Sequence, residues 1–382
     1  MKPVKPVSGG TPAVTPSAAA RAFDPERLQQ ARQLALKTKQ DVADAVGVSA
    51  AAIGQFEAGI TPPRADTVEK LAGYLKVPAG FFAAGRPRVR LESDNVFFRS
   101  LRSTTSRQRK KAISFTEQVW ELANALERHV RFPSVDIPGF AGGEIAPGTF
   151  SPDPATAARQ LRQAWDLGDG PVPQVVRLVE SRGIVAVLVP MVEDEVARID
   201  AFSTSAFNRP VMVLSPDRAD DVYRHRFSAA HELGHIVLHG GRVAGTADIE
   251  READKFAAEF LTPRAAMEPR LKTRLDMADV LRVSLEWGVE PKSVIYRSRE
   301  LGKISEATAR RGYIRLNQVG VHHEPVAQFP GELPSLLSTA IELAEQRGVT
   351  ISRLASELAW IPAHVRRMLG SQDERPRLRL VD

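Results

Sequence analysis

The most informative motif of the chain is H-E-L-G-H, residues 231–235, within R-F-S-A-A-H-E-L-G-H-I-V-L-H, residues 226–239. If this stretch is helical, His231 and His235 lie on one side, because residues four apart lie one above the other. Two imidazoles in that arrangement can bind the same metal ion. Glu232 follows on the adjacent flank, where a carboxylate can take a proton from a water molecule at the metal.

Catalytic zinc sites normally have three protein ligands, so a third ligand is expected downstream. The segment I-E-R-E-A-D-K-F-A-A-E-F-L-T-P, residues 249–263, has a helical pattern that ends at its proline. Glu252 and Glu259 share a face with Lys255, and that face is expected in solvent. Glu250 instead shares its face with small and apolar residues. We therefore predict Glu250 as the third ligand.

Four nearby residues have predicted supporting roles. Asp254 lies one turn beyond Glu250 and is expected to accept a hydrogen bond from the far nitrogen of a ligand imidazole. His239 is expected to be packed or hydrogen-bonded rather than a ligand. His225 and Tyr223 are candidates for polarising a substrate carbonyl, and a structural role is the alternative for each.

These motifs resemble two families, one nested in the other. The H-E-L-G-H and E-R-E-A-D pair resembles the gluzincin pattern of H-E-x-x-H followed by E-x-x-x-D. More closely, residues 226–239 and 249–263 resemble the ImmA/IrrE family of metallopeptidases, over roughly residues 170–300. The resemblance implies a zinc-dependent endopeptidase of bacterial or phage origin whose known substrates are transcriptional repressors. Thr262 stands where the family usually has methionine, and this difference leaves the predicted ligands untouched.

The composition limits the class of protein. The chain has 382 residues and is 43% hydrophobic, which is enough for two or three cores. It has no apolar run of about 18 residues and no apolar signal-peptide core, so we expect a cytoplasmic protein with no membrane partner. The absence of cysteine excludes disulfides and thiolate zinc sites. The net charge of +6 permits nucleic-acid binding.

The N-terminal part predicts short helices separated by tight turns. Thr38, with Asp41 three residues on, is expected to start a helix that ends at Gly47, and Ser49 is expected to start the next. A helix, a turn with glycine and a second helix form the helix-turn-helix arrangement, whose second helix enters the major groove. The predicted helices cover residues 26–36, 39–46, 50–58 and 64–75.

This segment resembles the Xre/Cro family of helix-turn-helix domains, carried by T-K-Q-D-V-A-D-A-V-G-V-S and I-G-Q-F-E-A-G. The resemblance implies that six residues face duplex DNA: Lys39, Gln40, Ser49, Ala51, Ala52 and Gln55. Among the side chains of the second helix, Gln55 can pair with adenine, while the alanines offer only methyl groups to thymine. The alternative is a domain that serves only protein interaction.

The remaining segments complete a multidomain chain in which an all-α domain precedes a mainly helical α+β peptidase domain with a small sheet. The sheet is expected from strands at residues 184–189, 199–203 and 211–214, and an edge of it could pair with an extended peptide. We predict a disordered tail over residues 1–22, a helix-turn-helix domain over 23–83, a basic helical linker over 84–154, a zincin-like peptidase domain over 155–300 and a helical C-terminal region over 301–382.

Two of these segments have alternative interpretations. The arginines and lysines of residues 83–112 either neutralise DNA phosphates or form an ordinary solvated surface. Residues 351–369 faintly resemble another helix-turn-helix around Pro362, and a dimerisation or docking element explains them equally well. A second copy of the chain is accordingly a candidate partner.

The leading functional hypothesis is a zinc endopeptidase that regulates transcription by cleaving a repressor and has its own DNA-binding domain. The alternative is a DNA-binding transcription factor, or an antitoxin, whose zincin-like domain is a non-catalytic sensor or dimerisation module. The intact pairing of Glu232 with a full ligand set favours the enzyme, because a decayed enzyme is expected to lose its base first.

Overall fold

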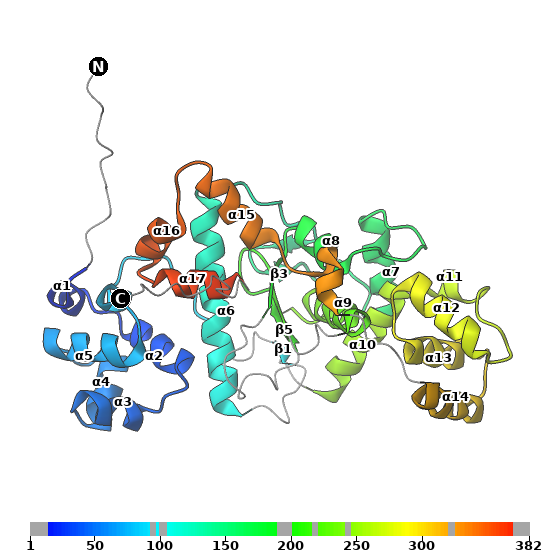
Figure 1. Ribbon diagram of the computed structural model, residues 1–382, viewed down its shortest axis with the longest axis horizontal. Helices are drawn as coiled ribbons and strands as arrows, with labels where there is room; N and C mark the ends of the chain where they lie inside the picture. Colours follow the sequence, from blue (N-terminus) through cyan, green and yellow to red (C-terminus); the bar gives the residue numbers. More distant parts are fainter. Residues whose placement is uncertain are drawn as a thin grey trace, which may run out of the picture. The chain divides into compact units, whose positions relative to one another are not determined.

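The computed structural model describes residues 14–91, 97–98, 105–188, 201–215, 221–240, 246–319 and 325–369 (Figure 1). The chain divides into two compact units. Unit 1 contains residues 1–90, 105–131 and 337–382, and unit 2 contains residues 91–104 and 132–336. In sequence, unit 2 therefore interrupts unit 1. Arg99, Arg102 and the predicted strand residues 189, 199 and 200 lie outside the described residues.

The N-terminal part of unit 1 is the predicted helix-turn-helix. Thr38 and Asp41 form a capping box at the start of α3, Gly47 ends it in the left-handed conformation at φ 78°, and Ser49 caps α4. The prediction of disorder for residues 1–22 is wrong for residues 16–21, which form α1 around the buried Ala19. The helices are α1 Pro16–Arg21, α2 Pro25–Leu34, α3 Lys39–Val46, α4 Ala50–Glu57, α5 Ala65–Leu75 and the 3₁₀ helix η1 Ala79–Phe82.

Helix α6, Ser106–Glu127, belongs to the interior of unit 1, although it falls in the stretch expected as a linker. It packs against α2, where Glu121 forms a buried ion pair with Arg27. On α17, the side chain of His364 lies 2.7 Å from Gln118 of α6. The C-terminal helices of this unit are α15 Leu336–Glu345, α16 Ile351–Leu358 and α17 Pro362–Met368.

Two arginines of the basic run contact protein rather than solvent. Arg86 donates hydrogen bonds to the carbonyl oxygens of Phe81 and Leu358, and burial lowers the pKa of its guanidinium to about 10. Arg88 forms an ion pair with Glu26 of α2. Carbonyl and carboxylate groups of unit 1 therefore bind these two side chains, and contact of the basic run with DNA phosphates stays a prediction.

Unit 2 contains a four-stranded sheet in the order β1-β5-β6-β4. β4 and β6 are parallel, whereas β5 is antiparallel to both β6 and β1. The strands are β1 Phe97–Phe98, β4 Val185–Leu188, β5 Ala201–Thr204 and β6 Val211–Leu214. A separate hairpin joins β2 Phe140–Ala141 to β3 Glu144–Ile145, and the neighbouring Ile137 is buried in the core of unit 2. Residues 137–145, which fall within the predicted linker 84–154, therefore belong to the folded part of unit 2.

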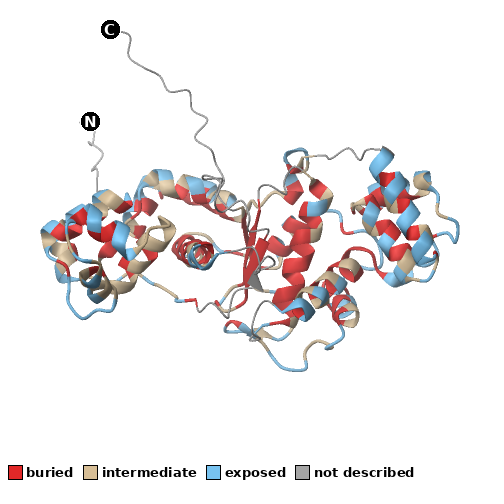
Figure 2. Ribbon diagram, turned by 90° about the horizontal axis from the view of Figure 1, so that it is seen from below, coloured by how far each residue is buried: buried red, intermediate tan, exposed pale blue. Residues whose placement is uncertain are grey.

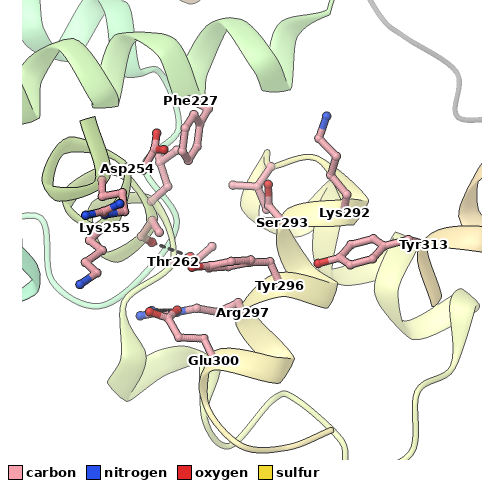
Figure 3. A pocket seen from close by; sticks show the side chains of 14 residues that line it. Phe227, Asp254, Lys255, Thr262, Lys292, Ser293, Tyr296, Arg297, Glu300 and Tyr313 are labelled. Atoms are coloured by element: carbon pink, nitrogen blue, oxygen red, sulfur yellow. Dashed lines mark hydrogen bonds and ion pairs between the residues drawn. The ribbon is translucent and has the colours of Figure 1, made fainter. Parts of the chain in front are cut away.

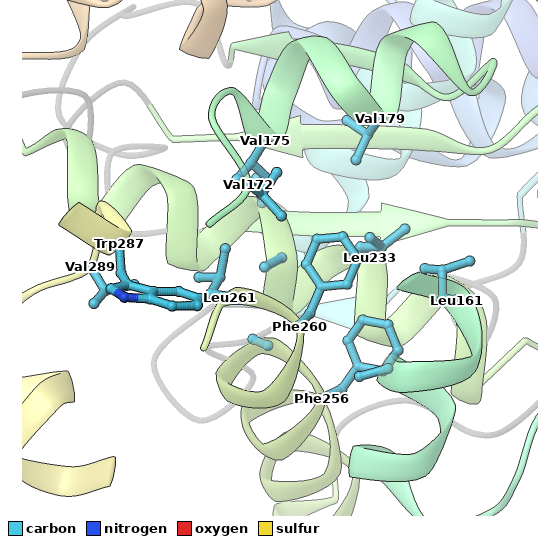
Figure 4. Close-up of a cluster of buried hydrophobic side chains, with 14 of the residues drawn as sticks. Leu161, Val172, Val175, Val179, Leu233, Phe256, Phe260, Leu261, Trp287 and Val289 are labelled. Carbon is cyan, nitrogen blue, oxygen red and sulfur yellow. The ribbon is translucent and has the colours of Figure 1, made fainter. Parts of the chain in front are cut away.

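The helices of unit 2 surround one apolar core (Figure 4). Helix α9, Val222–Leu238, packs on α10, Ala247–Leu261, and nearly every residue of its central turns is buried (Figure 2). A Cβ atom added at Gly234 would lie 3.1 Å from the ring of Phe256, so glycine permits this close approach. The other helices are α7 Pro154–Ala164, α8 Val175–Ser181, α11 Arg264–Met267, α12 Met277–Trp287, α13 Pro291–Glu300, α14 Glu306–Val319, η4 Val326–Gln328 and η5 Pro330–Glu332.

Candidate metal centre

Helix α9 carries both predicted imidazole ligands and the predicted base. Asp221 caps the helix by accepting hydrogen bonds from the backbone N–H groups of Tyr223 and Arg224. His231, Glu232 and His235 are each 0% exposed. Burying three ionisable side chains on one helix costs free energy unless other groups bind them, so their partners define the site.

Helix α10 brings Glu250 to the two imidazoles. The Nε2 atoms of His231 and His235 lie 3.0 Å apart. Glu250 Oε2 lies 3.3 Å from the first of these nitrogens, and Glu250 Oε1 lies 3.5 Å from the second. One ligand atom from each of the three side chains lies within 4.8 Å of the others, which is the spacing that a single bound ion requires.

A carboxylate sets the tautomer of His231. Asp254 Oδ1 lies 2.8 Å from Nδ1 of this ring, which is the contact expected from the sequence. Because an ionised carboxylate only accepts hydrogen bonds, the proton of His231 is assigned to Nδ1. The lone pair is then on Nε2, directed at the space shared with Glu250.

A second chain of hydrogen bonds sets the tautomer of His235. His239 Nε2 lies 3.0 Å from Glu252 Oε2, so His239 donates from Nε2 and accepts at Nδ1. His235 Nδ1 lies 2.9 Å from that acceptor and therefore donates to it. The lone pair of His235 is left on Nε2. His239 is thus hydrogen-bonded as predicted, and Glu252 contacts it, which corrects the expectation that Glu252 points only to solvent.

The donor set fits a divalent metal ion. Two imidazole lone pairs and one carboxylate converge, and their mutual repulsion is relieved when a cation binds between them. Glu250 Oε1 is buried and makes no hydrogen bond within the described residues. Nitrogen and carboxylate donors in this number suit Zn²⁺ better than Mg²⁺ or Ca²⁺, which prefer oxygen ligands.

Strand β5 holds the predicted base. The hydroxyl of Ser203 donates a hydrogen bond to Glu232 Oε2 at 2.7 Å and lies 3.2 Å from the backbone oxygen of the same residue. This contact fixes the carboxylate beside the two imidazoles. The contact of Ser203 could not be predicted from the sequence, because no local pattern links a strand residue to a helix residue 29 positions later.

Strand β5 is paired on both sides where it approaches the base. β6 pairs with one edge, and β1 pairs with the other at Phe97↔Ser203 and Phe98↔Phe202. Over these two residues β5 is therefore an inner strand, and the edges of the described sheet are β1 and β4. An extended peptide can add to β5 there only if β1 gives up its pairing. The pairing of a sheet edge with an extended peptide stays a prediction.

The structure corrects the expectation for Glu259 and favours one of the two alternatives for His225. Glu259 was assigned to a solvent face, but it is 1% exposed and forms ion pairs with Arg297 of α13 and, at 3.0 Å, Arg159 of α7. His225 is 0% exposed, and its Nε2 lies 2.9 Å from the backbone oxygen of Glu332. Burial lowers the pKa of His225 to about 4, so the ring stays neutral. This environment supports the structural alternative for His225.

A cavity of about 450 Å³ adjoins the centre and is lined by residues of α9, α10, α13 and α14 (Figure 3). It shares Asp254 with the hydrogen-bonded network of His231. Phe227 also lines it, and the ring of Phe227 lies 6.5 Å from that imidazole. Tyr296 and Tyr313 provide further aromatic surface.

The residues expected to face DNA lie on α3 and α4 of unit 1. Ala51 and Gln55 are exposed on the same face of α4. Lys39 lies 3.5 Å from Glu57, and Gln40 donates a hydrogen bond to Asp44 at 2.7 Å. Two residues contribute less to such a surface: the hydroxyl of Ser49 already caps α4, and Ala52 is half-buried. Their contact with DNA stays a prediction.

Taken together, these elements define two classes of domain in one chain: a helix-turn-helix domain and a metallopeptidase-type domain with a small sheet. Residues 179–299 match the family model of the IrrE N-terminal-like domain, a peptidase family, and residues 28–82 match the helix-turn-helix model. The suspected architecture is thereby confirmed. Comparison with curated proteins gives no match. Among the described helices, none has the length and apolar character needed to cross a membrane.

Proposed function

We propose that this chain is a zinc-dependent endopeptidase that regulates transcription by cleaving a repressor protein. The observation that carries this proposal is the convergence of His231, His235 and Glu250 within 4.8 Å beside the buried Glu232. Zinc held by the three side chains would supply a Lewis acid that polarises a carbonyl and lowers the pKa of water.

The chain's own residues account for the proton transfers of peptide hydrolysis. The carboxylate of Glu232 takes the proton from the attacking water and delivers it to the nitrogen of the departing amine. Ser203 keeps this carboxylate in place, so little reorganisation is needed during the reaction. Asp254 keeps the imidazole of His231 in the tautomer that leaves Nε2 as a ligand atom.

The cavity beside Asp254 is suited to bind part of the substrate. Its walls combine Phe227, Tyr296 and Tyr313 with the cations Lys255 and Lys292. An aromatic or aliphatic side chain with a neighbouring acidic group would therefore be accommodated. We infer that the substrate places such a sequence next to its scissile bond.

The helix-turn-helix domain supports a regulatory role, since this class of domain suggests binding to duplex DNA. A peptidase on the same chain as a DNA-binding domain has a raised effective concentration near a repressor bound at a neighbouring site. The affinity of the peptidase for the repressor can then be modest.

The competing function is a DNA-binding regulator whose zincin-like domain only senses a signal or forms a dimer. Neither sensing nor dimerisation requires a buried general base. Glu232 is nevertheless 0% exposed and bound by Ser203, and keeping a carboxylate in this environment costs free energy. This observation favours the enzyme.

Replacing Glu232 by glutamine tests the proposal, because it removes the proton acceptor and keeps all three proposed ligands. The measurements are zinc content and cleavage, assayed against candidate helix-turn-helix repressors of the same organism and against a peptide library. We expect about one zinc per chain in both proteins and at least a hundredfold loss of cleavage in Glu232→Gln. Glu268→Gln, on the surface of unit 2, is the matched control and should cleave normally. Equal cleavage by Glu232→Gln and wild type would refute this mechanism, and wild-type protein that holds zinc without cleaving any repressor or peptide library would support the sensor.

A further inference from the structure

The last three helices of unit 1 repeat the arrangement of its helix-turn-helix. Helices α2 and α15 each have 10 residues, and α3 and α16 each have 8. Thr38 and Thr350 cap α3 and α16 in the same way, each by accepting a hydrogen bond from the backbone three residues on. In both cases the next helix has its N-cap eleven residues after the threonine, at Ser49 and at Ile361.

The turn between the two short helices has the same geometry in both places. Gly47 has φ 78° and ψ 40°, and Ala359, at the equivalent position, has φ 50° and ψ 42°. Left-handed backbone is unfavourable for alanine, so the surrounding structure determines this conformation. The following amides, Val48 and Trp360, donate hydrogen bonds to Ala43 at 3.1 Å and to Ala355 at 2.8 Å.

The burial of side chains also repeats when the two segments are aligned on their threonine caps. Positions that face the core in the first segment face it in the second, with exposures of 0–2% and 0–5% respectively. The aligned pairs are Val42 with Leu354, Ala43 with Ala355, Val46 with Leu358, and Ile53 with Val365. Matching caps, turn and core positions make α15–α17 a second helix-turn-helix, which the weak sequence resemblance left open.

The exposed face of α17 corresponds to the face of α4 that is predicted to contact DNA. Ala51 and Gln55 are exposed on α4, and Ala363 and Arg367 are exposed at the aligned positions of α17. The opposite face of α17 packs in the core of unit 1, where Val365 is 0% exposed, and His364, one turn before Arg367 on the adjacent flank, lies 2.7 Å from Gln118 of α6. The arginine is therefore on the side left available to a ligand.

The charge of the second helix pair suits a polyanion better than that of the first. Helices α3 and α4 carry Lys39 against three acidic residues, Asp41, Asp44 and Glu57. Helices α16 and α17 carry three arginines, Arg353, Arg366 and Arg367, against Glu357 alone. Glu357 also lies 3.1 Å from Arg128, which offsets part of its charge.

We propose that α15–α17 form a second DNA-binding site, in which α17 enters the major groove and Arg367 contacts a guanine. Arginine pairs with the O6 and N7 atoms of guanine, whereas glutamine at the aligned position of α4 pairs with adenine. The chain then reads two elements of duplex DNA. This inference concerns unit 1 and does not depend on the peptidase being active.

Selection of binding sites from random duplex DNA by the full-length protein tests this proposal. Wild-type protein should select two sequence elements. Arg367→Gln should change the preferred base at one position of one element from guanine to adenine and leave the other element unchanged. Arg367→Ala should lower affinity for the selected DNA about tenfold. Arg310→Ala, an exposed arginine of α14 in unit 2, should have no effect.

A second variant covers the case in which substitution of Arg367 disturbs folding. Ala363→Glu places an acidic group on the same exposed face and should also weaken binding to the selected DNA. Thermal unfolding identifies any variant that does not fold. Selection of the same single element with the same affinity by wild type and all variants would overturn the proposal. A change confined to the oligomeric state in sedimentation would also overturn it, in favour of a dimerisation element.

Discussion

The candidate metal centre of unit 2 and the surface of unit 1 that is predicted to face DNA differ in burial and in the number of contacts that hold their side chains. His231, Glu232 and His235 are 0% exposed, and each is bound by a residue outside its own turn of helix. Ala51 and Gln55 are exposed on α4. In a buried, connected network, one substitution is expected to weaken the binding function of the whole site. On an exposed surface, one substitution is expected to remove only the contact of that residue.

The largest effect should follow from removing a proposed metal ligand. Glu250→Gln and His231→Ala should each lower zinc affinity by roughly a thousandfold, because each removes one of three protein ligands. Zinc content after dialysis against a competing chelator measures this loss. Full zinc retention by Glu250→Gln, together with loss in Glu252→Gln, would show that the wrong glutamate is assigned.

The next effect is on stability, and it involves both units. Burial lowers the pKa of His225 in unit 2 and of His364 in unit 1 to about 4. Between that value and the ordinary pKa near 6.5, the unfolded chain binds more protons than the folded chain, so the free energy of unfolding falls as pH falls. The expected loss is on the order of 3 kcal/mol for each histidine across this window.

Thermal unfolding followed from pH 7 to pH 4 in wild type and in His364→Gln checks that prediction. The variant should lose less stability over this range than wild type does. Parallel curves would mean that His364 is not neutral and buried in solution.

A smaller effect should follow from weakening the support of a ligand. Asp254→Ala should lower zinc affinity by about 10- to 100-fold, because the proton of His231 is no longer held on Nδ1. Asp248→Ala, at an exposed position of the same helix, is the control and should bind zinc as wild type does. Isothermal titration of zinc into the metal-free proteins measures the affinity of both variants. If Asp254→Ala binds zinc as tightly as wild type, Asp254 does not support the ligand.

The smallest effect belongs to the exposed surface. Gln55→Ala should reduce the preference for specific over non-specific DNA by about tenfold or less, while binding still weakens steeply as salt rises. Fluorescence anisotropy with full-length protein is the suitable measurement. A fragment of residues 23–112 is unsuitable, because it ends inside α6 and lacks the helices that pack on it. Binding that is insensitive to salt would favour a protein-interaction role instead.

Local rules predicted much of this molecule. Thr38, Asp41 and Gly47 bounded α3 correctly, because caps act within a few residues. The inward direction of Glu250 and its separation from Glu252 followed from angular position on one helix. The roles of these residues in metal binding remain predictions.

Other features depended on partners that are distant in sequence. Glu259 was placed in solvent because a single helix cannot show that Arg297 and Arg159 approach it. Glu332 binds Arg226 of α9 in a buried ion pair and accepts a hydrogen bond from the backbone of Val175 at 3.0 Å, across 106 and 157 positions. The periodicity of a single segment cannot predict contacts between segments that are distant in sequence. For this reason the sequence also did not predict that α6 packs inside unit 1.

The interruption of unit 1 by unit 2 has a consequence for synthesis on the ribosome. Helices α2–α6 emerge before residues 132–336, and α15–α17 emerge only after them. At ordinary elongation rates the delay is about 10–40 s. During that time Gln118 of α6 has no His364 to contact, so a chain arrested within unit 2 would display α3 and α4 without the second helix-turn-helix. Premature termination would therefore leave α6 without the helices that pack on it, and we expect unit 1 of such a chain to be less stable than in the finished protein.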